Sequence, residues 1–154
     1  MSDLRTCLWF DGAAEEAART HVELIAGSEI ESVVPGPEGR ALMVSLRLAG
    51  LPYTYLNGGP HHRLSPAVSI QVFTDDQAQT DALWAALTAG GAESMCGWCT
   101  DRFGVSWQVI PKDLPAYVGG EDPEGAAAAT EAMLQMTRID IDTLKAAYEA
   151  AAGG

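Results

Sequence analysis

The feature that most constrains the fold is a faint internal repeat, in which position 10 corresponds to position 73. The matching pairs at this offset of 63 residues are Phe10 and Phe73, Leu24 and Leu87, Ala26 and Ala89, and Gly27 and Gly90. Each match falls at the same place in a strand-then-helix order. Agreement of residue identity with element order indicates a duplicated unit. The chain is therefore predicted to contain two similar modules, each led by a strand and a helix.

The first half alternates between the two periodicities of regular structure. Apolar residues recur every three or four positions over 14–25, which is typical of a helix with one buried stripe. Leu42, Val44, Leu46 and Leu48 alternate with other residues, as in a strand with one covered face. Ala49-Gly50 predicts a tight hairpin turn. The predicted strands of this half are 4–10, 29–34, 42–48 and 51–57.

The second half repeats this order and then continues into a helical tail. Strands are predicted over 67–73, 94–100 and 105–110, with a helix over 77–88. In the tail, Asp122 is a helix-capping residue followed by Pro123, and this helix runs to about Met136. Asp140 is expected to cap a last short helix, with Ile139 and Leu144 as a hydrophobic staple.

Composition narrows the class of protein. Of the 154 residues, 47% are hydrophobic, which supports a real core, and the formal net charge is −12. An acidic chain without a Lys/Arg cluster repels phosphate backbones, so nucleic-acid binding is not expected. No apolar stretch is long enough to span a bilayer, and the three cysteines suggest no disulfide framework. We expect a cytoplasmic protein.

Several short motifs together resemble one known family. They are Phe10-Asp11-Gly12 with Ala14-Glu15-Glu16-Ala17; Asn57-Gly58-Gly59-Pro60; Cys96-Gly97-Trp98, Asp101 and Phe103–Pro111; and Asp122-Pro123, Met133, Met136, Asp140 and Leu144 in the tail. The chain resembles the PhnB-like, or 3-demethylubiquinone-9 3-methyltransferase-like, branch of the vicinal-oxygen-chelate superfamily, which includes glyoxalases, bleomycin resistance proteins and dioxygenases. The resemblance implies a bacterial homodimer of the α+β class.

In this fold, two βαβββ modules each curl into a half-open cup around a ligand site. We expect the first module over 1–60, the second over 61–112 and the helical tail over 113–154. The tail is an addition to the plan that the resemblance implies.

The resemblance also implies where a divalent metal would bind. Superfamily enzymes place ligands on the first strand, on the strand that opens the second module, and on the last strand. The corresponding residues here are Thr6 (with Leu4 as the alternative), Ser69 and Gln108. Hydroxyls and a neutral amide are weak metal ligands. No tightly bound metal and no other cofactor is therefore expected.

The strands are nevertheless expected to have a polar face opposite the helices. If so, a concave polar surface beside aromatic residues would suit an unknown small molecule, whereas the alternative is an ordinary solvated sheet face. Within it, Arg47 is either a partner for a ligand carboxylate or phosphate or an exposed strand arginine. The predicted ligand-binding residues are Thr6, Arg47, Tyr53, Tyr55, Asn57, Ser69, Gln71, Ser106 and Gln108, with Ser45 on the same face.

Three other groups of residues have both a functional and a structural interpretation. The Cys96-x-x-Cys99 pair is either redox-active or half of a zinc site, with His61-His62 to complete it, or simply two strand cysteines. Its position in a strand favours the structural interpretation. His21, on the apolar stripe of the first helix, is interpreted as a core or interface histidine. The four tryptophans are assigned to the core, with one or two at a pocket or interface.

The leading hypothesis is a small-molecule-binding homodimer without a tightly held metal. The alternatives are a metal-dependent lyase or dioxygenase of the superfamily and a non-catalytic, ligand-sequestering protein. Methyl transfer, which the family label names, lacks support from the residues, because no Gly-x-Gly-x-x-Gly turn follows a strand.

Overall fold

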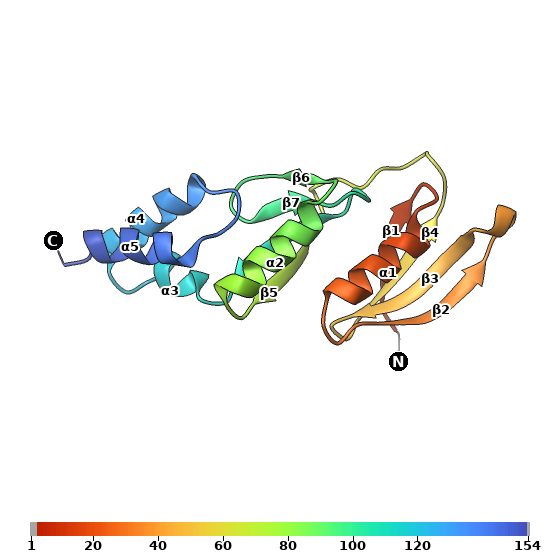
Figure 1. The fold of residues 1–154 in the computed structure, drawn as a ribbon, viewed down its shortest axis with the longest axis horizontal. Helices are drawn as coiled ribbons and strands as arrows, with labels where there is room; N and C mark the ends of the chain where they lie inside the picture. The colour runs from red at the N-terminus through yellow and green to blue at the C-terminus, as the bar shows by residue number, and fades with distance from the viewer. Residues whose placement is uncertain (1–2, 154) are drawn as a thin grey trace. The chain divides into compact units, whose positions relative to one another are not determined.

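A computed structural model of the chain describes residues 3–153. It divides into two compact units, Met1–Ser65 and Pro66–Gly154. Each unit contains one four-stranded sheet, and the helical tail belongs to the second unit (Figure 1). The predicted α+β class, with two strand-and-helix modules and a helical tail, is confirmed. The predicted limits of the three segments stay predictions.

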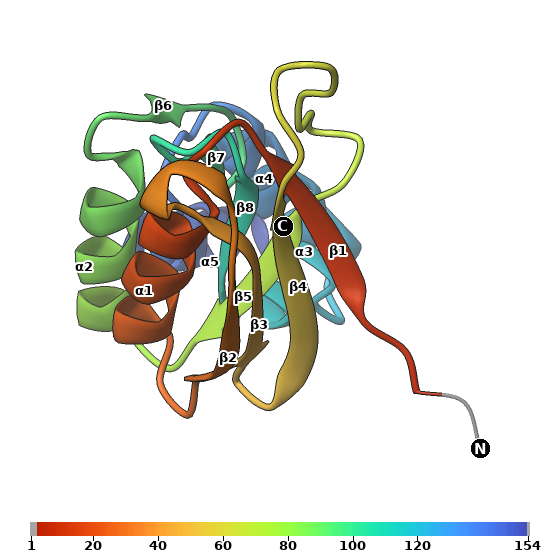
Figure 2. The same cartoon turned by 90° about the vertical axis from the view of Figure 1, so that its right-hand side faces the viewer.

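The first unit contains β1 (Thr6–Phe10), α1 (Ala14–Leu24), β2 (Glu29–Pro35), β3 (Ala41–Leu48) and β4 (Leu51–Asn57). Its strand order is β1-β4-β3-β2. Strand β1 runs parallel to β4, and the other pairs are antiparallel. A short 3-10 turn, Pro37–Gly39, joins β2 to β3. The single helix α1 lies against one face of this twisted sheet (Figure 2).

Strand alternation creates the core of the first unit. Leu8, Phe10, Val44 and Leu46 are almost fully buried, as their alternating positions predict. Leu42 departs from this pattern and is 43% exposed. The register of β2 with β3 shifts between Val34 and Pro35, and Leu42 falls at this irregularity. The prediction that Leu42 packs with the other three apolar residues of β3 is therefore wrong.

The second unit repeats this plan with shorter strands. It contains β5 (Ile70–Thr74), α2 (Gln77–Thr88), β6 (Ala92–Glu93), β7 (Trp98–Thr100) and β8 (Ser106–Pro111). Its strand order is β5-β8-β7-β6, with β5 parallel to β8. Helix α2 contacts β5, β7 and β8. The core of this unit contains Trp84 and Leu87 of α2 and Trp107 and Val109 of β8, all of them buried. Val68 lies before β5 and is 63% exposed, contrary to its predicted place under the helix.

The duplication is visible in the fold, but its offset changes by one residue. The helices begin at Ala14 and Gln77, which are 63 positions apart, whereas the leading strands begin at Thr6 and Ile70, which are 64 apart. A slip of one residue moves a strand side chain to the opposite face. Phe10 is 4% exposed, whereas Phe73 is 55% exposed. These two phenylalanines are therefore not structural counterparts.

Hydrogen bonds and close packing around Asn57, Gly58 and Gly59 connect β4 and the loop after it to β1, β3 and the start of α1. The Asn57 side chain accepts a hydrogen bond from the Ala14 backbone N–H (2.9 Å) at the start of α1 and donates one to the Ala41 carbonyl (2.8 Å). The Trp9 indole N–H donates to the Gly59 carbonyl at 2.8 Å. A Cβ at Gly58 would lie 2.1 Å from the Trp9 ring, so a glycine is required there.

In the second unit, Asp101 organises the turn between β7 and β8. One carboxylate oxygen accepts the backbone N–H groups of Phe103 (2.9 Å) and Val105 (3.0 Å). The other oxygen accepts the Trp107 indole N–H at 2.8 Å. Asp101 is only 6% exposed, so it satisfies three donors that the fold buries or partly buries.

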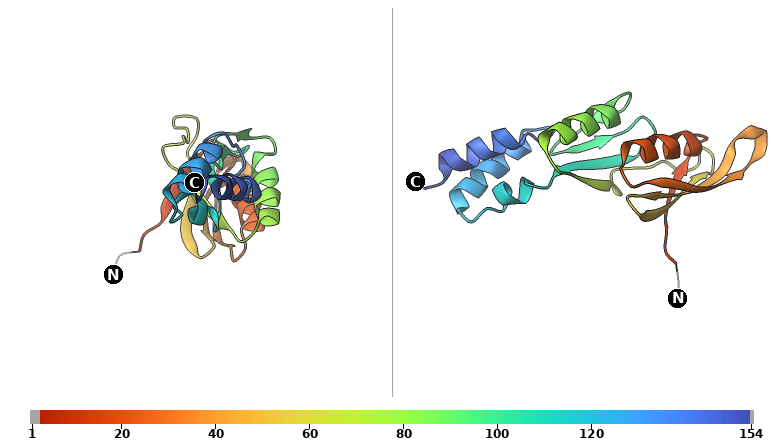
Figure 3. Two further views of the ribbon diagram at one scale, coloured as in Figure 1. Left: turned by 90° about the vertical axis from the view of Figure 1, so that its left-hand side faces the viewer. Right: turned by 60° about the horizontal axis from the view of Figure 1, so that its bottom comes forward.

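The tail consists of α3 (Leu114–Val118), α4 (Pro123–Leu134) and α5 (Ile141–Ala151), which lie beyond the end of the second sheet (Figure 3). The predicted caps are confirmed: Asp122 accepts the Gly125 N–H and Asp140 accepts the Thr143 N–H, both at 2.8 Å. Ile139 and Leu144 are fully buried. The short helix α3 was not predicted.

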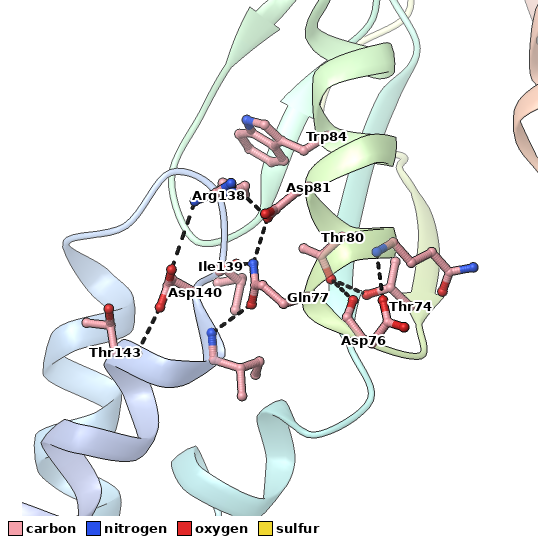
Figure 4. Close-up of polar contacts among 12 residues, drawn as sticks. Thr74, Asp76, Gln77, Thr80, Asp81, Trp84, Arg138, Ile139, Asp140 and Thr143 are labelled. Atoms are coloured by element: carbon pink, nitrogen blue, oxygen red, sulfur yellow. Dashed lines mark hydrogen bonds and ion pairs between the residues drawn. The ribbon is translucent and has the colours of Figure 1, made fainter.

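Gln77, at the start of α2, fastens the tail to the second module (Figure 4). Its amide nitrogen donates to the Ile139 carbonyl and its amide oxygen accepts the Ile141 N–H, both at 2.9 Å. Arg138 adds an ion pair with Asp81 at 2.7 Å. The tail is thus attached to the N-terminal part of α2 by hydrogen bonds to its backbone and by an ion pair.

We predict that Asp101→Ala lowers the free energy of unfolding by about 3 kcal/mol or more, because buried donors lose their charged acceptor. Urea denaturation measures this loss. The matched control is Asp113→Ala, since Asp113 is exposed and its side chain makes no capping hydrogen bond. The control should change stability by no more than about 0.5 kcal/mol. Equal effects of the two variants would contradict the assigned role of Asp101.

Candidate functional site

Each sheet has one face covered by its own helix and a second face, here called the open face, that points away from that helix. Alternation and strand register assign every side chain to one of the two. In the second sheet, Trp107 and Val109 lie under α2, so Gln108 lies on the open face. In the first sheet, Val44 and Leu46 lie under α1, so Ser45 and Arg47 lie on the open face.

Three of the predicted site residues meet on the open face of the second sheet. The Gln71 amide nitrogen donates to the Gln108 amide oxygen at 3.1 Å, and the Gln108 amide nitrogen donates to the Ser69 hydroxyl at 2.7 Å. Gln71 and Gln108 are direct register partners of the parallel strands β5 and β8. We call Ser69, Gln108 and Gln71 the amide row.

A fourth predicted residue, Ser106, lies on the same face of β8 as Gln108. It is 3% exposed, and its hydroxyl oxygen has no hydrogen-bond partner among the described residues. A buried polar atom without a partner costs free energy that a ligand or water can recover. Ser106 is therefore a candidate contact for a bound molecule.

Two aromatic side chains flank the amide row. Trp98 on β7 is the direct antiparallel partner of Gln108, so the two side chains lie on one face. Phe73 is the register partner of Ile110 on that face and is 55% exposed. This face thus combines hydrogen-bonding groups with flat apolar surface, as small-molecule sites do.

The open face of the first sheet carries charged side chains, whereas that of the second sheet carries neutral amides and hydroxyls. Arg47 forms an ion pair with Glu31 at 2.8 Å, and Arg5 forms a second one with the same carboxylate at 2.6 Å. The hydrogen bond from Arg5, with a further contribution from Arg47, lowers the pKa of Glu31 below its usual value against the opposing effect of burial. Cys7 and Trp9 lie on this face of β1 by alternation.

The other four predicted residues lie on the helix-covered face of the first sheet. Thr6 and Tyr53 are register partners and share the side of Leu8 and Phe10. Tyr55 is fully buried, and its hydroxyl lies 2.7 Å from the Nδ1 atom of His21 on α1. The prediction that Thr6, Tyr53, Tyr55 and Asn57 share a face with Arg47 is therefore wrong.

The error at Thr6 comes from the one-residue change in the repeat. Extrapolating from Ser69 by 63 positions leads to Thr6, whereas the strands correspond at 64 and lead to Arg5. Gln71 likewise corresponds to Cys7. The pairing of Trp98 with Gln108 was also missed, because the Cys96-to-Trp98 turn obscures the start of β7. The alternation of β1 identifies the correct face: Thr6 lies two residues before Leu8 and therefore shares the buried side of Leu8 and Phe10.

The open-face residues do not suit the divalent metal that the resemblance implies. Both polar atoms of the Gln108 amide already take part in hydrogen bonds, and its neighbours are a second amide and a hydroxyl. Tight divalent sites in proteins use imidazole, thiolate or carboxylate ligands. Among residues 3–153, no group of three or more His, Cys, Asp and Glu side chains is arranged to hold a metal ion.

The cysteines and His21 have structural surroundings. Cys99 on β7 is 2% exposed, and burial, followed by the negative charges of Asp101 and Glu93, raises its pKa to about 12. Cys96 precedes the strand, is half-buried, and its thiol contacts the Met133 carbonyl of the tail. All three cysteines are free. His21 is 1% exposed in the core, as predicted.

Comparison with known families decides the affiliation of the chain. Residues 2–110 match the family model described as 3-demethylubiquinone-9 3-methyltransferase. The chain belongs to this family. The match ends within β8, so α3, α4 and α5 lie outside it. No curated protein sequence gives a significant match.

Solved structures agree with this affiliation. The PhnB protein from Bacillus cereus, which carries the same methyltransferase description, is 26% identical with a TM-score of 0.67, over 71% of this chain and 99% of that one. A protein from Pseudomonas aeruginosa is 23% identical with a TM-score of 0.61, over 72% and 98% of the two chains. A fosfomycin resistance protein from Listeria monocytogenes shares only the fold, with 12% identity and a TM-score of 0.51 over 71% and 90%.

The fold is of the glyoxalase/bleomycin resistance type. Among residues 3–153, no helix has the length and apolar character needed to cross a membrane.

We predict that the three thiols of the native protein differ widely in reactivity. At pH 8, exposed Cys7 should react quickly with a chromogenic disulfide reagent, whereas Cys99 should not, because with a pKa of about 12 it is almost entirely protonated. The Cys7→Ser variant should lack the fast phase of the reaction. In the natural protein, unfolding should make all three thiols reactive. Rapid formation of a Cys96–Cys99 disulfide in native protein would instead support the redox interpretation.

Proposed function

We propose that this chain binds a small polar molecule on the open face of its second sheet, through the amide row. The observation that carries the proposal is the connected set of Ser69, Gln108 and Gln71 beside the buried, unpartnered hydroxyl of Ser106. Trp98 and Phe73 would contact an apolar part of the same ligand.

The amide row favours a ligand that carries both a donor and an acceptor. The hydrogen bonds of the row point from Gln71 to Gln108 to Ser69. Among residues 3–153, the hydroxyl hydrogen of Ser69 and the amide oxygen of Gln71 are therefore left for a ligand. Aligned hydrogen bonds in such a chain strengthen one another. A neutral molecule with a flat apolar part and a carbonyl, hydroxyl or amide group matches this arrangement.

The chemistry of the row favours binding over metal-dependent catalysis. Its three side chains are neutral, so none is a general base near neutral pH. A ligand-sequestering protein is therefore the second candidate, and a metal-dependent lyase or dioxygenase is the less supported one. Methyl transfer is not part of the proposal, because each sheet is a mixed βαβββ sheet rather than the parallel sheet that binds S-adenosylmethionine in common methyltransferases.

The resemblance further supports a homodimer in the cytoplasm as the working form. Sedimentation equilibrium of the purified chain tests the dimer.

We predict that Gln108→Ala weakens ligand binding about tenfold, the usual worth of a lost hydrogen bond in a binding site. The measurement is tryptophan fluorescence during titration with a library of neutral aromatic amides and carbonyl compounds, and Trp98→Phe identifies the reporter. Gln135→Ala, at an exposed glutamine after α4, is the matched control. If both variants bind every hit as the natural protein does, the amide row is not the site.

We also predict that untagged protein retains less than one equivalent of divalent metal, because amides and hydroxyls hold such ions weakly. Elemental analysis of the natural protein and of Gln108→Ala tests this. Stoichiometric metal that disappears in the variant would instead make metal-dependent superfamily chemistry the leading function.

A further inference from the structure

Two arginines on the open face of the first sheet share one carboxylate. The Arg5 Nη2 atom lies 2.6 Å from Oε2 of Glu31, and the Arg47 Nε atom lies 2.8 Å from its Oε1. Each carboxylate oxygen thus serves a different guanidinium group. We call Arg5, Glu31 and Arg47 the arginine pair site.

The guanidinium groups are held in place by backbone as well as by Glu31. Arg5 donates to the Tyr53 carbonyl at 3.3 Å, and Arg47 donates to the Gly50 carbonyl at 2.9 Å. Gly50 lies in the turn before β4, and Tyr53 lies near the start of that strand. Side chains fixed in this way lose little further entropy when an anion binds.

Hydrogen-bond donors at this site outnumber the acceptors that they contact. Arg5 and Arg47 share the Glu31 carboxylate, and Glu29, the register partner of Arg47, lies opposite it on the neighbouring strand. Other described pairs, such as Arg19 with Glu15 and Lys112 with Asp75, join one cation to one carboxylate. Each guanidinium group has five N–H donors, so those that neither Glu31 nor the backbone engages can donate to a further oxyanion.

The backbone around Glu31 is irregular in a way that suits a site. The register of β2 with β3 shifts between Ile30 and Ser32, which leaves Glu31 as the extra residue of a β-bulge. Bulges redirect side chains and are frequent next to binding sites. The side chains of Arg5 and Arg47 are 35% and 40% exposed, against 24% for Glu31, so the cations remain accessible.

We propose that Arg5 and Arg47 form a binding site for a small oxyanion, carboxylate or phosphate, and that Glu31 acts as the internal carboxylate with which the anion competes. This site lies on the first sheet alone and does not depend on the function proposed for the amide row. The hydroxyl groups of Ser45 and Thr54, register partners on the same face, offer additional donors to the anion.

The decisive variant is Glu31→Gln, which should strengthen anion binding, because it removes the competing charge and keeps the shape of the side chain. We expect phosphate to bind the variant about tenfold more tightly than the natural protein. The measurement is an NMR titration of the arginine Nε–H signals with inorganic phosphate, then with acetate, at pH 7 and constant ionic strength. The preferred probe distinguishes a tetrahedral from a planar oxyanion.

The matched control is Glu15→Gln, which removes the same charge from an ion pair with Arg19 on α1 and should leave binding unchanged. Adding Arg47→Gln to Glu31→Gln should abolish binding, with folding checked by circular dichroism. Gln108→Ala should have no effect, which separates this site from the amide row. The proposal is overturned if Glu31→Gln binds phosphate no better than Glu15→Gln, or if binding survives the loss of Arg47.

Discussion

Each four-stranded sheet of this protein is covered by one helix, and the rest of the structure depends on that constraint. The buried apolar side chains of the strands point toward α1 or α2, as those of Leu46 and Val109 do. The residues between them are then free to be polar. The amide row and the arginine pair site both lie on open faces, where the alternation of the strands places side chains outside the core.

Several residues of the motifs that identify the family maintain the framework of the fold. Asn57 joins the start of α1 to the sheet, Gly58 makes room for Trp9, and Asp101 holds the turn before β8. Two candidate binding residues, Ser106 and Gln108, belong to the same stretch of motif residues as Asp101. Membership in the family specifies the fold closely and leaves the ligand open.

Periodicity alone located most helices and strands, and the caps Asp122 and Asp140 marked the tail. The face of each strand was harder to assign, because a one-residue difference between the helix and strand offsets is invisible in residue identities. Gln71, Gln108 and Ser69 were assigned correctly within the second module, whereas Tyr55 was misplaced. The ion pair of Arg5 with Glu31 involves a residue at a β-bulge in β2, and no short sequence motif predicts this bulge.

The attachment of the tail has an evolutionary consequence. Gln77 recognises the carbonyl of Ile139 and the N–H of Ile141, groups that almost every residue possesses. Such a contact constrains the path of the chain at residues 139 to 141, whereas the burial of Ile139 and the capping hydrogen bond of Asp140 constrain which amino acids lie there. Mutations at exposed positions of α4 and α5 can therefore accumulate while this short segment keeps the tail attached, which gives the added tail freedom to acquire new surface properties.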